Sequence, residues 1–124
     1  MNDRTPVSRW NTIFRCLAAE PRREIVATLS ETDPNATIPM PESALSTHSA
    51  ADPDRLQTEL YHTHLPMLAD NGYVVWHPEP FVAERGPAFR EIDTVLAAII
   101  DDADSFPPDL IAGCDRLERA TDAE

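Results

Sequence analysis

The sequence is poor in the features that define several large classes of enzymes and membrane proteins. Only three of its 124 residues are glycine, and none of them belongs to a glycine-rich loop that could hold phosphates. It has neither an HExxH motif nor a GxSxG nucleophile elbow. Its longest apolar run, Val95–Ile100, is far shorter than the ~20 residues of a transmembrane helix. These patterns do not indicate an enzyme, and we expect the protein not to be one.

Cysteine is also scarce. Cys16 and Cys114 lie far apart, and no CxxC pair or Cys/His cluster indicates a zinc site. We therefore expect no metal and no other cofactor. Isolated cysteines of an intracellular chain usually behave as small buried apolar side chains, so we do not expect a disulfide.

The first ten residues are polar and lack the apolar segment of a secretion signal, which favours a cytoplasmic location.

Lysine is absent. All ten basic residues are arginine, and 22 acidic residues give a net charge of −12. An acidic composition without lysine resembles that of proteins from halophilic archaea; an acidic protein from a dilute environment is the alternative. In dilute buffer such a charge repels DNA phosphates. Near 1 M salt the screening length is about 3 Å, so the repulsion largely vanishes. Attractive phosphate contacts weaken as well, so a DNA reader there relies on base contacts and DNA shape.

The first predicted helix begins at Ser8, whose side chain can cap it, and ends before Pro21. Trp10, Ile13, Phe14 and Leu17 follow the spacing i, i+3, i+4 and i+7. This spacing places the four side chains on one apolar stripe, which we expect to pack against the core.

Prolines, glycines and capping residues divide the rest of the chain. Pro21 suits the first turn of a second helix. Asp52 or Asp54 can cap a long helix that Gly72 stops in the left-handed conformation. The predicted elements are helices at Pro21–Ser30, Glu42–Thr47, Asp54–Asn71 and Pro87–Asp101, an extended segment at Thr37–Pro41, strands at Tyr73–Trp76 and Phe81–Arg85, a last helix carrying Leu110, Ile111, Cys114 and Leu117, and a frayed tail from Ala120 to Glu124.

This order predicts an α+β fold that is mainly α. Two helices, a short strand, two more helices and a β-hairpin are the arrangement of a winged helix-turn-helix, in which the hairpin is the wing. We therefore expect a winged helix-turn-helix domain at residues 1–86 and a C-terminal helical extension at residues 87–124.

Two motifs carry a family resemblance. Leu17–Val26, LAAEPRREIV, is similar to the opening of the arsenic-repressor-like (ArsR-type) transcriptional regulators. His64–Val74, HLPMLADNGYV, is similar to the exit of their recognition helix, and it most resembles uncharacterised winged helix-turn-helix domains of halophilic archaea. The resemblance covers about residues 10–85 and implies sequence-dependent DNA binding in transcriptional regulation. His62 and Thr63 stand where those regulators usually have Ser and Gln, and the cysteine pair of the metal sensors is absent here.

The geometry of the long predicted helix indicates whether its two histidines, His62 and His64, can bind one metal ion. Because each residue turns the helix by about 100°, Tyr61, Leu65 and Leu68 share an apolar face, with Leu60 and His64 at its edge. Residues two apart diverge on a helix, so the His62/His64 pair is poorly placed to chelate one metal ion. We expect His64 to be half-buried with a hydrogen-bonded ring nitrogen, and His62 to face solvent. Pro66 cannot donate to the His62 carbonyl, so it either bends the helix or leaves that carbonyl to water.

The resemblance and the outer helix face together define a predicted DNA surface. The side chains of the long helix would enter the major groove, the wing would be anchored by an arginine, and two arginines of the second helix would contact the backbone. Surface pairing of those two arginines with Glu20, Glu24 or Glu31 is the alternative. The predicted DNA-binding residues are Arg55, Thr58, His62, Thr63, Arg85, Arg22 and Arg23. Acidic residues on the same surfaces oppose this function: Glu59, Asp70, Glu79 and Glu84.

The helix at Pro87–Asp101 has a strong apolar stripe with coiled-coil-like spacing. Packing within one chain and pairing with a second chain both fit this pattern. We expect a homodimer, since a dimer suits a regulator that reads two half-sites. The predicted dimer interface consists of Phe89, Ile92, Val95, Leu96 and Ile99.

Double-stranded DNA is thus the expected partner, and the function we favour is that of a DNA-binding transcriptional regulator. A protein-interaction module or adaptor that uses its acidic surface or the C-terminal helix without binding DNA is the alternative. The arginines discriminate between the two: convergence on one face favours DNA, and neutralisation by carboxylates favours the adaptor.

Overall fold

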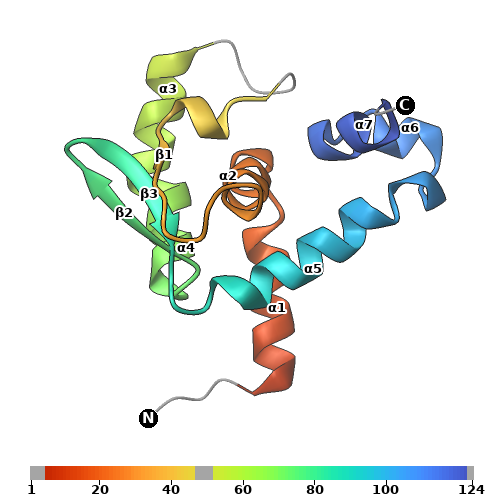
Figure 1. Ribbon diagram of the computed structural model, residues 1–124, viewed down its shortest axis with the longest axis horizontal. Coiled ribbons are helices and arrows are strands. Elements are labelled where there is room, and N and C mark those ends of the chain that lie inside the picture. The colour runs from red at the N-terminus through yellow and green to blue at the C-terminus, as the bar shows by residue number, and fades with distance from the viewer. Residues whose placement is uncertain (1–4, 47–51, 123–124) are drawn as a thin grey trace.

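The computed structural model describes residues 5–46 and 52–122 (Figure 1). The fold is α+β and mainly helical, with a small antiparallel sheet. Its elements are α1 (Pro6–Cys16), α2 (Glu20–Ser30), β1 (Ile38–Pro39), the 3-10 helix η1 (Glu42–Ala44), α3 (Pro53–Glu59), the π-helix η2 (Leu60–His64), α4 (Leu65–Asp70), β2 (Val74–Pro78), β3 (Phe81–Arg85), α5 (Phe89–Asp101), the 3-10 helix η3 (Ala103–Ser105), α6 (Pro108–Ile111) and α7 (Asp115–Asp122).

Helix α1 begins earlier than predicted. Its cap is Thr5, whose Oγ1 accepts a hydrogen bond from the Ser8 backbone N–H at 3.1 Å. Pro6 follows in the first turn, where a missing N–H costs nothing. The prediction that Ser8 is the cap was therefore wrong. Ser8 instead lies inside the first turn and donates its hydroxyl to the Thr5 carbonyl.

The predicted apolar stripe of α1 divides into two faces. Ile13 and Leu17 are buried in the core, as expected. Trp10 and Phe14 are 51% and 57% exposed, and their rings stack with centroids 5.6 Å apart. The expectation that all four side chains pack inward was wrong for these two aromatic residues, because only the side of the helix that carries Ile13, Cys16 and Leu17 joins the core cluster.

The central helix, α2, lies in the middle of the molecule and supplies much of the core (Figure 1). Its side chains Ile25, Val26 and Leu29 have no exposed surface. Burial of such aliphatic side chains is the dominant stabilising term of a small domain. The short helix predicted after it is only one 3-10 turn, η1. It buries Ala44 but leaves Leu45 exposed, and Thr47 lies outside the described residues.

The predicted long helix is present as a run of α3, η2 and α4. Of the two predicted candidates, Asp52 is the cap and accepts from the backbone N–H groups of Asp54 and Arg55. Gly72 stops the helix with φ of 77°, as predicted. The Leu65 N–H donates to the Leu60 carbonyl, which makes the middle of the run a π-turn. The sequence left open whether Pro66 bends the helix or leaves the His62 carbonyl to water. The structure shows a widened turn just before Pro66, and such turns often accompany a lost helical hydrogen bond.

The π-turn also changes which side chains face the core. Leu60 and His64, expected at the edge of the apolar face, are buried with Leu65 and Leu68. Tyr61, expected in the centre of that face, is only half-buried. A π-turn holds one more residue than an α-turn, so it rotates the preceding part of the helix relative to the following part.

The sheet has three strands in the order β1-β3-β2, all antiparallel. Strands β2 and β3 form the predicted hairpin, in register from Val74 opposite Arg85 to Pro78 opposite Phe81. Strand β2 continues to Pro78, two residues beyond the predicted end. The segment Ile38–Pro39 pairs with Ala83 and Val82 of β3, so the predicted extended segment becomes the third strand.

Helix α5 packs on α1 and α2 of the same chain. Phe89, Ile92 and Leu96 belong to the core cluster and are at most 3% exposed. The prediction that these three residues form a dimer interface does not fit this packing, because they already contact the interior of their own chain. Val95 and Ile99 are half-buried at the edge of the helix.

The C-terminal segment forms two short helices, α6 and α7, where one helix was predicted. Arg116 of α7 is buried, and its Nε donates to the Glu24 carboxylate at 3.2 Å. A second nitrogen of Arg116 lies 2.9 Å from Glu31. These ion pairs join the segment to α2. Residues 120–122, predicted to be frayed, belong to α7, and the last two residues lie outside the described part. No helix in the described part is long and apolar enough to cross a membrane.

Candidate nucleic-acid interface

The outer face of α3 and η2 is polar and open to solvent. Arg55, Thr58 and His62 follow the helical spacing three and four, so they lie on one face, with Thr63 beside them. All four side chains are exposed. Burial of Leu56, Leu60 and His64 on the opposite side of the helix fixes this orientation. The structure therefore brings together the four predicted contacts of the long helix.

Carboxylates surround this face. Nε of Arg55 lies 3.2 Å from Oε2 of Glu59, an i,i+4 ion pair whose Arg side chain is 72% exposed. Asp52 and Asp54 stand at the start of the helix, where negative charge interacts well with the helix dipole. An exposed pair of this kind contributes little to stability and exchanges easily for another partner. Arg55 is thus held loosely and can reach a ligand.

An aromatic cluster fixes the hairpin against the long helix. The rings of Tyr61 and Phe81 stack with centroids 4.5 Å apart, and Trp76 meets Tyr61 edge-on at 5.4 Å. The Tyr61 hydroxyl donates to the Pro78 carbonyl at 3.2 Å. The sequence contained part of this signal, since Trp76 and Phe81 are diagonal neighbours across the predicted hairpin. The role of Tyr61 was missed because it was assigned to the core.

Near the end of the hairpin, His77 and Glu84 face each other across the two strands. Nε2 of His77 lies 3.0 Å from Oε2 of Glu84. This pair, with the exposed Glu79, makes the outer part of the hairpin acidic or neutral rather than basic.

Arg85 does not point to the outside of the hairpin. Its Nε and Nη2 donate to the Leu29 carbonyl at 3.2 and 2.8 Å, and Nη2 also donates to the carbonyls of Ser30 and Thr32. Its guanidinium carbon lies 4.9 Å from the centre of the Phe89 ring. The predicted role of Arg85 as a DNA anchor does not fit this geometry. A cation that binds the last carbonyls of a helix stabilises that helix end, here α2.

Arg22 and Arg23 have a similar role at the end of α1. Arg22 is 6% exposed and donates to the carbonyls of Cys16 and Arg15 at 2.8 and 3.1 Å. Arg23 donates to the Leu17 carbonyl at 2.6 Å. The predicted backbone contacts of both residues therefore do not fit, and neither does the alternative of surface pairing with glutamates. Both side chains turn back to the free carbonyls left at the end of the preceding helix.

His64 joins α1 and α2 to the long helix. Its Nδ1 lies 2.7 Å from Nη1 of Arg22, which must be the donor because a guanidinium has no acceptor. The proton of the neutral ring is then on Nε2, which lies 4.0 Å from Oε1 of Glu59. Burial, and then the Arg22 charge, lower the pKa of His64 against the opposing effect of Glu59. The expectation of a hydrogen-bonded ring nitrogen was confirmed, but His64 is buried rather than half-buried, and nothing in the sequence pointed to Arg22 as its partner.

Comparisons with known proteins add no homologue. No family model matches the chain, and no curated protein or solved structure is significantly similar to it. Within residues 5–46 and 52–122, no group of three or more His, Cys, Asp or Glu side chains is arranged to hold a metal ion.

Proposed function

We propose that the chain is a winged helix-turn-helix domain that binds double-stranded DNA as a transcriptional regulator in the cytoplasm. The order of elements supports this proposal: α2 and η1 precede the long helix, and the β2–β3 hairpin follows it at once. Strand β2 packs on α4, so the hairpin lies beside the long helix, where a wing would flank a DNA groove (Figure 1).

The observation that carries the proposal is the exposed face formed by Arg55, Thr58 and His62. A helix in the major groove reads bases with side chains of these types: arginine donates to guanine, and threonine or histidine forms hydrogen bonds with base edges or phosphates. Thr63 is also exposed and lies next to His62. Figure 1 shows α3 and the hairpin on one side of α2, with α6 and α7 on the other, so no C-terminal helix covers the face.

Because carboxylates surround this face, we expect the affinity for DNA to depend on salt in an unusual way. Asp52, Asp54 and Glu59 would repel phosphates in dilute buffer, and Arg22, Arg23 and Arg85 are engaged with backbone carbonyls. Molar salt screens this repulsion to within about 3 Å. We therefore expect the affinity for DNA to stay constant or increase as KCl rises to molar concentration. Cationic DNA-binding proteins show the opposite, a steep loss of affinity.

Fluorescence anisotropy with a pool of labelled genomic duplexes, over a KCl series, tests the proposal. Arg55→Ala and His62→Ala should each weaken selective binding by about five-fold to a hundred-fold, the range of a lost base contact. Arg119→Ala is the matched control, because Arg119 is also exposed but lies on α7. Equal affinity of all four proteins would refute the assigned contact face.

A protein-interaction module is the second candidate, and a specific observation favours it. Three of the four arginines predicted to contact DNA are bound to carbonyls, and the fourth pairs with Glu59. They do not converge on one open face. If the folded protein binds no duplex at any KCl concentration, the helix and hairpin serve a protein partner, and affinity capture of that partner becomes the next experiment.

A further inference from the structure

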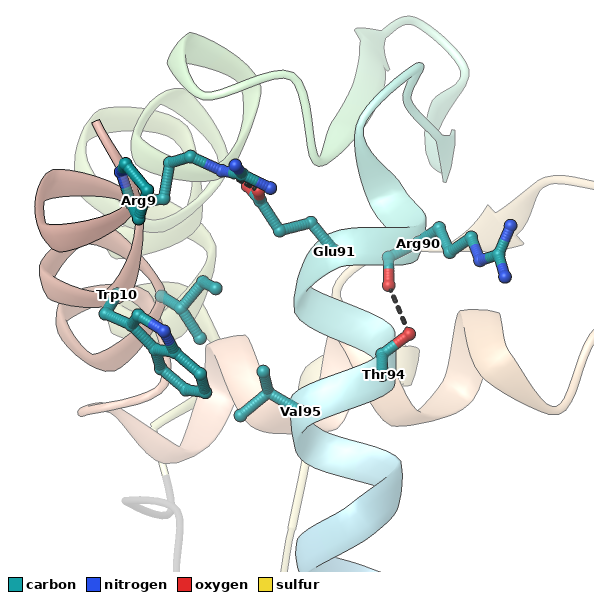
Figure 2. Close-up of a pocket in the computed structure, with 8 residues that line it drawn as sticks. Arg9, Trp10, Arg90, Glu91, Thr94 and Val95 are labelled. Carbon is teal, nitrogen blue, oxygen red and sulfur yellow. Dashed lines mark hydrogen bonds and ion pairs between the residues drawn. The ribbon is translucent and has the colours of Figure 1, made fainter. Parts of the chain in front are cut away.

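A groove of about 470 Å³ lies between α1 and the first half of α5. Small-molecule binding sites have volumes of roughly 300–1,000 Å³, so the groove has the size of such a site. Pro6, Trp10, Ile13 and Val95 form its apolar part. Figure 2 shows Trp10 of α1 and Val95 of α5 directed towards the groove from its two sides. The groove can therefore hold the apolar part of a small ligand.

Trp10 is the largest apolar side chain of the groove, and its ring is held in place without a ligand. The ring stacks on that of Phe14, with centroids 5.6 Å apart. Trp10 nevertheless remains 51% exposed. A ligand that fills the groove would remove water from this indole surface, and burial of apolar surface is the main source of affinity in such sites.

Arg9 and Glu91 form the charged part of the groove. Nε of Arg9 lies 2.6 Å from Oε1 of Glu91, and Oε2 of Glu91 accepts a hydrogen bond from the hydroxyl of the fully buried Tyr73 at 3.2 Å. Tyr73 thus fixes the Glu91 carboxylate, and Glu91 orients the Arg9 guanidinium. Because a guanidinium has five N–H donors, an arginine held through Nε can still offer its two terminal nitrogens to both oxygens of a carboxylate. The Arg9 side chain is 48% exposed, so a ligand can reach it.

The charges of the lining select the type of anion. Two arginines and one glutamate give the groove a net charge of +1, on a chain whose net charge is −12. One carboxylate matches this charge. A doubly charged phosphate would bring a second negative charge next to Glu91, which is unfavourable. Figure 2 shows Arg90 extending away from Trp10 and from the Arg9–Glu91 pair, so we assign the anion to Arg9.

We propose that this groove binds a small apolar monocarboxylate, such as a medium-chain fatty acid. The carboxylate accepts hydrogen bonds from the terminal nitrogens of Arg9, and the apolar chain lies between Trp10 and Val95. The site includes no residue of the exposed face on α3 and η2. It goes beyond the proposed DNA function, and its tests use the protein without DNA, so the two proposals fail separately.

Isothermal titration calorimetry of the wild-type chain with octanoate, in molar KCl, is the first test. A probe of about ten heavy atoms should bind with a Kd of roughly 0.1–10 mM, from the usual free energy per ligand atom. Octanamide is the matched probe, because it has the same size and no charge. It should bind at least about ten-fold more weakly, the effect of losing one charged hydrogen bond.

Two arginine variants locate the carboxylate. Arg9→Gln should weaken octanoate binding at least about ten-fold and should leave octanamide binding nearly unchanged. Arg15→Gln is the matched control, because Arg15 is also an exposed arginine of α1 but does not line the groove. This variant should bind octanoate like the wild type. Thermal melts establish that each variant is folded.

Tryptophan fluorescence locates the apolar chain. The protein has two tryptophans, so a Trp76→Phe background leaves Trp10 as the only reporter. The emission of Trp10 should shift to shorter wavelength, and its quenching by acrylamide should fall, over the octanoate concentrations at which heat is released.

Four results would overturn the proposal. They are the absence of octanoate binding, equal octanoate affinities of Arg9→Gln and Arg15→Gln, equal affinities of the wild-type chain for octanoate and octanamide, and octanoate binding without a change in Trp10 emission. An emission that shifts with protein concentration alone and does not respond to octanoate would also overturn it, since a second copy of the chain would then occupy the groove.

Discussion

Replacing Arg85 by alanine tests whether this residue stabilises the fold or contacts DNA. In the structure its guanidinium donates to the carbonyls of Leu29, Ser30 and Thr32 and stacks on the Phe89 ring. A hydrogen bond from a charged donor contributes about 1.5–3 kcal/mol, and a cation–π contact at a partly exposed site about 0.5–1 kcal/mol. Because Arg85 is only half-buried, water can replace some of these contacts. We expect Arg85→Ala to lower the free energy of unfolding by roughly 2–3 kcal/mol.

Urea denaturation followed by circular dichroism, in molar KCl, measures this loss. The expected stability change corresponds to a fall in melting temperature of very roughly 6–15 °C for a domain of this size. Arg55→Ala is the matched control, because Arg55 has only one exposed ion pair and should change stability by less than ~0.5 kcal/mol. Arg85→Lys should recover only part of the loss, since an ammonium group cannot span the same carbonyls. An Arg85→Ala variant as stable as the wild type would refute the capping role.

Two further predictions concern the interior. The pKa of His64 in the folded chain lies below the ordinary value of 6.5, so the unfolded chain takes up a proton at a higher pH than the folded chain does. The contribution of neutral His64 to the free energy of unfolding should therefore be fully present above pH 6.5 and decline as the pH falls below it. Denaturation midpoints between pH 5 and 8 should show this decline in wild type and a weaker one in His64→Gln; parallel curves would contradict the assignment. A Cβ at Gly86 would lie 2.5 Å from the Gly72 carbonyl oxygen, so Gly86→Ala should destabilise the chain by about 1–3 kcal/mol. Gly113→Ala, where the nearest contact is 3.6 Å, is the control, and equal melting temperatures would disprove the close approach.

Local chemistry explains the part of the fold that was predictable. Asp52 caps the long helix and Gly72 ends it because capping and left-handed stops depend on one or two residues. The hairpin was predictable from the strand-favouring residues of Tyr73–Trp76 and Phe81–Arg85 on either side of a proline-containing turn. The π-turn before Pro66 was not, because the choice between a bend, a free carbonyl and a wider turn depends on what the surrounding core accepts.

The candidate contact face was only partly predictable. The exposure of Arg55, Thr58, His62 and Thr63 follows from helix geometry once the buried side is known. Helix geometry does not predict what the side chains of Arg22, Arg23 and Arg85 contact. A long flexible side chain near a helix end can bind a phosphate, a carboxylate or a backbone carbonyl, and sequence spacing does not distinguish between them.

The sequence by itself determined most of the helices, the hairpin and their order, because caps, prolines, glycines and apolar periodicity act over a few residues. Only the tertiary structure decided what each side chain meets. Arg85 reaches carbonyls 56 to 53 positions earlier in the chain, and Arg22 reaches His64 across 42. Trp10 and Phe14 remain exposed although their spacing matches that of a core stripe. Such contacts form only when elements distant in the sequence pack together, so the local spacing of residues does not predict them.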